Sequence, residues 1–125
     1  MFDATAAAIT GYLRAALFTG TDDDDRPLDG SFTLDDFSPD ALDSAVADVG
    51  SFLTETAPIL PDTMEPDDIG INLWFSRNGH GTGFWDGGLG EVGETLHGIA
   101  AAMGEAVVEI GDDGKLYILS SSWGG

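Results

Sequence analysis

The chain contains no cysteine and few basic residues, and both shortages narrow the possible functions. Without cysteine there are no disulfides, no thiolate metal sites and no cysteine nucleophile. Only four Lys and Arg residues stand against 23 Asp and Glu residues, which gives a formal net charge of −19. A surface this negative repels the phosphates of nucleic acids and the headgroups of anionic lipids. We therefore expect no direct binding to nucleic acid or membrane, and any charged partner should itself be basic.

A long hydrophobic run is also missing. Residues 1–18 are rich in alanine, but Asp3, Gly11 and Arg14 interrupt them and no basic segment precedes them. We expect neither a signal peptide nor a membrane span, and hence a cytoplasmic protein. The 125 residues, 42% of them hydrophobic, are enough to bury one core. Residues 1–125 are expected to form a single domain.

Helical spacing of the apolar residues predicts three helices, over residues 4–18, 39–57 and 89–103. The second has the clearest start. Ser38 can cap the free amides of the first turn, and Pro39 suits the first helical position.

Alternation over residues 69–76, turn residues at 77–81, and apolar runs on both sides of residues 111–114 predict four strands, paired as two hairpins. The first hairpin is expected from residues 69–76 and 83–86, and the second from residues 106–110 and 115–119. The element order is then ααββαββ. We expect an α+β fold in which helices pack on one face of a small antiparallel sheet made of two hairpins.

The acids are concentrated in residues 22–68, which hold 15 of the 23 and only one base, Arg26. This acidic helix and loop segment precedes a hairpin–helix–hairpin scaffold over residues 69–119. A block of like charges is typical of an exposed surface. The candidate partner-binding residues are Asp22, Asp23, Asp24, Asp25, Asp35, Asp36, Asp40, Asp43, Asp48 and Glu55.

The second predicted helix separates apolar residues from acids when its residues are placed at 100° intervals. The apolar residues expected to face the core are Leu42, Val46, Val49 and Leu53. The acids expected on the opposite side are Asp40, Asp43, Asp48 and Glu55. These four carboxylates span about 22 Å of helix, so their mean spacing is several Å. The phosphates of one DNA strand also recur every few Å, about 3.4 Å apart along the axis.

Such a row of carboxylates predicts a protein that occupies the basic groove of a nucleic-acid-binding protein. The Lys and Arg side chains of the groove would form with carboxylates the charge-assisted bonds that they form with phosphates. Two alternatives remain open. The acidity also fits adaptation to high salt or a general gain in solubility, and the domain also fits an accessory protein that contacts other proteins without resembling DNA.

The sequence RNGHGTGFWD, residues 77–86, places Arg77, His80 and Asp86 within ten residues. A histidine, a carboxylate and an arginine on a glycine-rich turn are compatible with an acid–base site. They are equally compatible with a structural turn in which Phe84 and Trp85 cover the core. No motif of a known nucleophile, phosphate loop or zinc protease accompanies them, so we expect a structural role and no catalytic residue.

Metal binding is a further possibility, because Asp22–Asp25 and residues 111–114 offer carboxylate oxygens. Neither segment has the spacing of a calcium-binding loop. We therefore expect no specific metal site and no cofactor.

Residues 71–117 resemble a family of small phage and prophage proteins. The shared features are the RNGHGxGFWD motif, a G-x-L-G helix start and a closing GDDG hairpin. In size and charge the chain is also similar to phage-encoded DNA mimics that inhibit CRISPR or restriction systems. The motif resemblance implies phage ancestry and not a reaction. The likeness in size and charge implies a non-enzymatic inhibitor that acts in the host cytoplasm on a host defence protein, with an oligomeric state that it leaves open.

Overall fold

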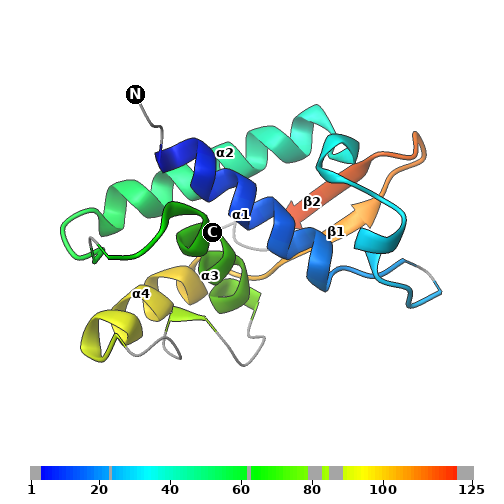
Figure 1. The fold of residues 1–125 in the computed structure, drawn as a ribbon. Helices are drawn as coiled ribbons and strands as arrows, with labels where there is room; N and C mark the ends of the chain where they lie inside the picture. Colours follow the sequence, from blue (N-terminus) through cyan, green and yellow to red (C-terminus); the bar gives the residue numbers. More distant parts are fainter. Residues whose placement is uncertain (1–3, 23, 62, 79–82, 85–88, 121–125) are drawn as a thin grey trace.

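The computed structural model describes residues 4–22, 24–61, 63–78, 83–84 and 89–120. These residues form an α+β fold of helices and one antiparallel hairpin (Figure 1). The α-helices are α1 (Ala4–Thr19), α2 (Pro39–Thr56), α3 (Pro66–Asn78) and α4 (Glu91–Ala102). Two short 3-10 helices, η1 (Leu28–Gly30) and η2 (Leu34–Asp36), lie between α1 and α2, and the strands are β1 (Ala106–Ile110) and β2 (Leu116–Ser120).

The three predicted helices are confirmed as α1, α2 and α4. The predicted start of α2 is also confirmed, because the Ser38 hydroxyl accepts a hydrogen bond from the Ala41 N–H at 3.0 Å and Pro39 is the first helical residue. Within the described part of the chain, no helix combines the length and the apolar character needed to cross a bilayer.

The predicted first hairpin is wrong, because residues 69–76 lie in helix α3. The predicted order ααββαββ, with its hairpin–helix–hairpin scaffold, is therefore not confirmed, and the described α-helices and strands follow the order ααααββ. The described Gly83 and Phe84 are not in a strand, and the rest of the predicted strand 83–86 lies outside the described residues. The error has a physical cause. The buried face of α3 includes Gly70, Ser76 and Arg77 as well as apolar residues. The apolar residues alone therefore do not mark out one helical face in the sequence.

Helices α1 and α3 cross at unusually close range. A Cβ atom built on Gly70 would lie 1.8 Å from the Ala8 carbonyl oxygen of α1, and one built on Gly11 would lie 2.0 Å from the Asp67 carbonyl oxygen of α3. Both distances are far below van der Waals contact, so each helix needs glycine at the crossing. The crossing brings the rings of Tyr12 and Trp74 into a T-shaped contact, with ring centroids 5.2 Å apart.

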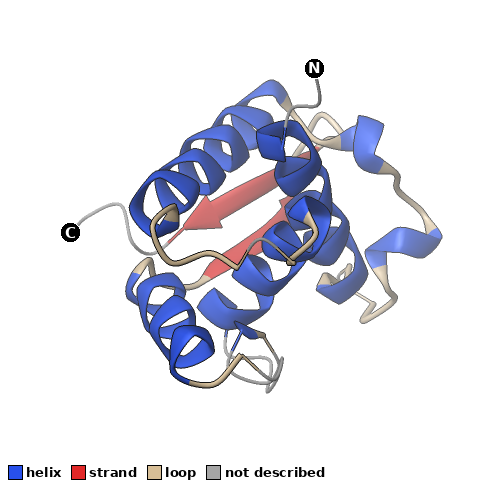
Figure 2. Cartoon of the chain, turned by 60° about the vertical axis from the view of Figure 1, so that its left-hand side comes forward, coloured by secondary structure: helices blue, strands red, loops and turns tan. Residues whose placement is uncertain are grey.

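The second predicted hairpin is confirmed as β1 and β2, which pair in register from Ala106 opposite Ser120 to Ile110 opposite Leu116. Its two faces differ. Ala106, Leu116 and Ile118 are buried, whereas Val107 and Leu119 on the other face are half exposed. The helices therefore cover one face of the sheet, as expected (Figure 2).

The buried face of α2 is rotated from the predicted one. Leu42 and Val46, expected in the core, are 40% and 51% exposed. The buried residues of the helix are Ala41, Ala45, Val49, Phe52 and Thr56. Val46 and Asp48 lie about 160° apart around a helix. A rotation that buried Val46 would therefore remove Asp48 from its buried partner Arg77, to which it is bonded at 2.8 Å.

The close crossing predicts opposite effects of alanine at two helical glycines. Gly70→Ala should lower the free energy of unfolding by about 3 kcal/mol, because the new methyl group meets backbone atoms of α1 that cannot yield locally. Gly50→Ala should raise it by about 0.5–1 kcal/mol, because a Cβ on Gly50 of α2 meets open space. Urea denaturation followed by circular dichroism measures both, and equal stability of the two variants would contradict the crossing.

Candidate acidic binding surface

Helix α2 exposes three of its four predicted acids. Asp40, Asp43 and Glu55 are exposed, and about 22 Å of helix separates the first from the last. The row is not continuous. Between Asp43 and Glu55 the exposed side chains include Ala47 and Ser51, which leaves about 18 Å without a carboxylate. The acids of α2 therefore gather at its N-terminal end, with Glu55 apart from them.

The segment before α2 adds further carboxylates to that end. Asp35 is exposed in η2, and Asp36 is half-buried. The Asp36 carboxylate accepts a hydrogen bond from the Thr33 N–H at 2.7 Å, while the Thr33 hydroxyl accepts one from the Asp35 N–H. This reciprocal capping holds both aspartates in a fixed position relative to the start of α2.

The hairpin contributes to the same end of α2, which sequence analysis did not foresee. The Tyr117 hydroxyl donates a hydrogen bond to Asp113 at 2.7 Å. This bond raises the pKa of Tyr117, and the negative charge of Asp40 on α2 raises it further. The neighbouring Ser38 N–H donates to the Leu116 carbonyl of β2 at 2.8 Å. Asp113 and Tyr117 thus join Asp40 in one surface, through a tertiary contact that has no signal in the sequence.

The aspartate run after α1 folds into a compact turn. One Asp22 oxygen accepts hydrogen bonds from the N–H groups of Asp24 and Arg26, and the other oxygen pairs with the Arg26 guanidinium at 3.2 Å. The Arg26 N–H bond, more than any other cause, holds the pKa of Asp22 below its usual value. Asp24 pairs with Arg26 at 2.9 Å, Asp25 is exposed with a left-handed φ of 62°, and Asp23 lies outside the described residues.

Asp48 points inward, contrary to the prediction that it faces solvent with the other acids of α2. Its carboxylate pairs with the Arg77 guanidinium, whose side chain has no exposed area. The same guanidinium donates to the Tyr12 hydroxyl at 2.8 Å and to the carbonyl oxygens of Gly104 and Met103 at 2.8 and 3.1 Å. Asp48 thus neutralises a buried charge, and its side chain is only 26% exposed, so it does not face solvent freely as predicted.

The described part of RNGHGTGFWD has structural roles, as expected. Besides Arg77, Asn78 links two elements: its side chain donates to the Trp74 carbonyl and accepts from the Ala106 N–H. Phe84 is buried and stacks on Phe52 at 5.3 Å between ring centroids. A Cβ on Gly83 would lie 2.3 Å from the Ser76 hydroxyl oxygen, which explains the glycine. His80, Trp85 and Asp86 lie outside the described residues. The acid–base site that His80 and Asp86 would form therefore stays a prediction.

One pair that sequence analysis missed does resemble a nucleophile and base. The Ser76 hydroxyl lies 3.1 Å from Nδ1 of His97. Ser76 is buried, and its oxygen also accepts a hydrogen bond from the Phe84 N–H. Neither Ser76 nor His97 lines the two cavities beside β1 or the cavity between Phe18 and Phe75. Among the described residues, no group of three or more His, Asp or Glu side chains converges to hold a metal ion.

The inward position of Asp48 predicts a stability difference between two aspartates of α2. Asp48→Asn should lower the free energy of unfolding by about 2–3 kcal/mol, because Arg77 then keeps a buried charge without a carboxylate. Asp43→Asn on the exposed side should change it by less than about 0.5 kcal/mol. Urea denaturation of the two variants checks this, and equal free energies would place Asp48 in solvent.

Tyr12 predicts a loss of stability at high pH. Burial raises the pKa of Tyr12 to about 12, against an opposing effect of the nearby Arg77 charge. An unfolded tyrosine ionises near pH 10. The contribution of Tyr12 to stability is therefore complete below pH 10 and is lost as the pH rises through 12. Tyrosinate absorbance of a Tyr117→Phe variant reports Tyr12 alone, and a midpoint near pH 10 would contradict its burial.

A comparison of the chain with protein-family models, characterised proteins and solved structures finds no match. The likeness of residues 71–117 to small phage proteins therefore stays a prediction.

Proposed function

We propose that the protein is a non-enzymatic inhibitor that binds the basic groove of a nucleic-acid-binding host defence protein, such as a CRISPR effector or a restriction enzyme, in place of nucleic acid. The observation that supports this proposal most directly is the position of Asp35, Asp36, Asp40 and Asp43 in and just before the first turns of α2. Asp113 is bonded to Tyr117, the neighbour of Leu116, whose carbonyl accepts the Ser38 N–H at that end of the helix. The proposed target acts in the host cytoplasm, where the inhibitor would also be found.

The charge distribution supports a basic partner. Of the four basic residues, Arg77 is buried with Asp48, and Arg26 is paired with Asp22 and Asp24. Neither therefore offsets the exposed acids of α2. Of the other two, Arg14 is exposed on α1, and Lys115 lies in the hairpin turn with Asp113, where it offsets part of the negative charge. Lys and Arg side chains of a groove can form short, charge-assisted bonds with these carboxylates, and the net charge of −19 accelerates encounter at low salt.

Hydrogen bonds support the geometric part of the proposal. A substitute for a nucleic acid backbone needs negative groups in fixed positions, and flexible side chains lose entropy when bound. Asp36 is held by the Thr33 N–H, and Asp113 is held by Tyr117 and the Lys115 N–H. These carboxylates are ordered before a partner arrives.

A second candidate function, adaptation to high salt without a DNA-like role, is favoured by a different observation. Exposed acids also occur far along the chain from α2: Asp67 and Asp68 in α3, Glu91 and Glu94 in α4, and Glu109 in β1. Acids spread in this way keep a protein hydrated and soluble. The two candidates differ in whether one group of acids matters more than another.

The proposal predicts that charge reversal is damaging at α2 but not at α4. Asp40→Lys/Asp43→Lys and Glu91→Lys/Glu94→Lys each reverse two exposed acids three residues apart, so both change the net charge equally. Capture of a basic protein from host lysate should fall at least about tenfold for the α2 pair and less than about twofold for the α4 pair. Asp48 is left intact because its reversal would unfold the protein.

Duplex DNA supplies the decisive competitor in this experiment. We expect it to displace the captured protein from the wild-type chain, and added salt to weaken capture steeply. Equal effects of the two double variants, together with a free energy of unfolding that rises toward molar salt, would reject the inhibitor and favour salt adaptation.

A further inference from the structure

Beyond Ala106, whose N–H bonds to the Asn78 side chain, the edge of strand β1 has no partner strand among the described residues. The Gly111 N–H donates to the Lys115 carbonyl, and hydrogen-bonded pairs alternate along an antiparallel hairpin. Val107 and Glu109 therefore bond to β2, whereas the N–H and C=O groups of Val108 and Ile110 point away from it. Within the described residues, no hydrogen bond to these outward groups is found. The opposite edge, on β2, is covered where the Ser38 N–H bonds to the Leu116 carbonyl.

A second extended segment lies across from this edge. Thr21 and Pro27 form an antiparallel bridge, flanked by bonds from the Asp22 N–H to the Arg26 carbonyl and from the Leu28 N–H to the Gly20 carbonyl. This pattern directs the N–H and C=O groups of Thr21 away from Pro27. In the described part of the chain neither group has a backbone partner.

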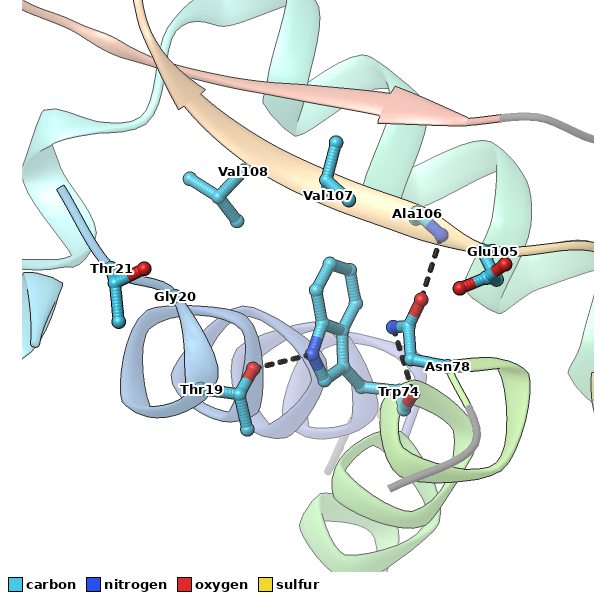
Figure 3. A pocket seen from close by; sticks show the side chains of 9 residues that line it. All are labelled: Thr19, Gly20, Thr21, Trp74, Asn78, Glu105, Ala106, Val107 and Val108. Atoms are coloured by element: carbon cyan, nitrogen blue, oxygen red, sulfur yellow. Dashed lines mark hydrogen bonds between the residues drawn. The ribbon is translucent and has the colours of Figure 1, made fainter. Parts of the chain in front are cut away.

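Two cavities occupy the space between Thr21 and β1. One, of about 250 Å³, is lined by Thr21, Val108 and the ring of Trp74 among others, and the second, of about 260 Å³, by Thr21, Asp22 and residues 108–110. Figure 3 shows Thr21 and Val108 on opposite sides of the first cavity, with the Trp74 indole standing between α1 and β1. The Trp74 ring is fixed by its N–H bond to the Thr19 hydroxyl at 2.8 Å.

We infer that this slot accepts an extended, basic segment of a partner protein, which adds to the sheet as a third strand beside β1. Backbone groups of the segment would bond to Val108 and Ile110, as in β-strand addition generally. The charged residues that line the two cavities are Asp22, Glu105 and Glu109, all acids. Arg26 pairs with Asp22, so the exposed Glu109 is the main group to which Lys or Arg side chains of the segment are complementary. A second copy of the chain, with its own charge of −19, is the wrong occupant. This inference does not rest on the proposed function, which concerns the surface around α2.

The probe is a synthetic eight-residue peptide of alternating lysine and valine with blocked ends, added to the full-length protein. Amide hydrogen exchange by NMR should slow at least about tenfold at Val108 and Ile110, whose N–H groups gain partners. Exchange at Val107 and Glu109 should change less than about twofold, because their N–H groups already bond to β2. Slowed exchange at neither Val108 nor Ile110 overturns the inference.

Matched charge variants separate the slot from a general attraction. Glu109→Lys should weaken peptide binding about fivefold, whereas Glu94→Lys on α4, with the same change in net charge, should weaken it less than about twofold. Val108→Pro removes an outward N–H without removing a β1–β2 bond, and should weaken binding at least about tenfold. Equal weakening by the two lysine variants overturns the inference. So does a dimer of the wild-type protein in analytical sedimentation that Val108→Pro converts to a monomer, because the edge of β1 would then pair with a second copy.

Discussion

The buried guanidinium of Arg77 is the interaction on which the arrangement of the helices depends. An unpaired charge in the interior costs several kcal/mol, so it must find partners wherever it is buried. Its partners come from α1 through Tyr12, from α2 through Asp48, and from the end of α4 through the Met103 and Gly104 carbonyls. Only the assembled fold supplies all of them. Any displacement of α2 or α4 relative to α3 therefore leaves part of the guanidinium without a bond.

This internal pairing also determines what the surface presents. The Arg77–Asp48 pair is neutral as a unit, so the whole net charge of −19 belongs to the remaining groups. Repulsion among them opposes compaction. The close contact of α1 with α3 at Gly11 and Gly70 opposes that repulsion with tight packing. The fold thus tolerates a grouped set of carboxylates around the start of α2 because its stability comes from elsewhere.

Sequence patterns predicted those elements whose signals are local. The Ser38 cap, the apolar spacing of the helices and the apolar runs on both sides of the turn at residues 111–114 needed no knowledge of distant residues. The prediction was wrong for helix α3 because its apolar residues Ile69, Ile71, Leu73 and Phe75 alternate as in a strand. Pro66 and Asp67 do supply helix-start signals. The inward turn of Asp48 depends on a partner 29 residues away, and the approach of Asp113 to α2 depends on how the hairpin packs.

The two edges of the hairpin differ, because among the described residues only the edge of β2 forms a backbone hydrogen bond with another segment. Negative charge explains why the edge of β1 need not pair with a second copy of the chain. The edge of β2 is covered by the residues that begin α2, whereas the edge of β1 is bordered by the acidic turn at Asp22 and by Glu109. An exposed strand edge ordinarily invites pairing between copies of the same protein. Two copies of this chain would bring acids against acids along β1, which disfavours such pairing. A basic strand meets no such repulsion, so the same charges that keep copies apart select what the edge can accept.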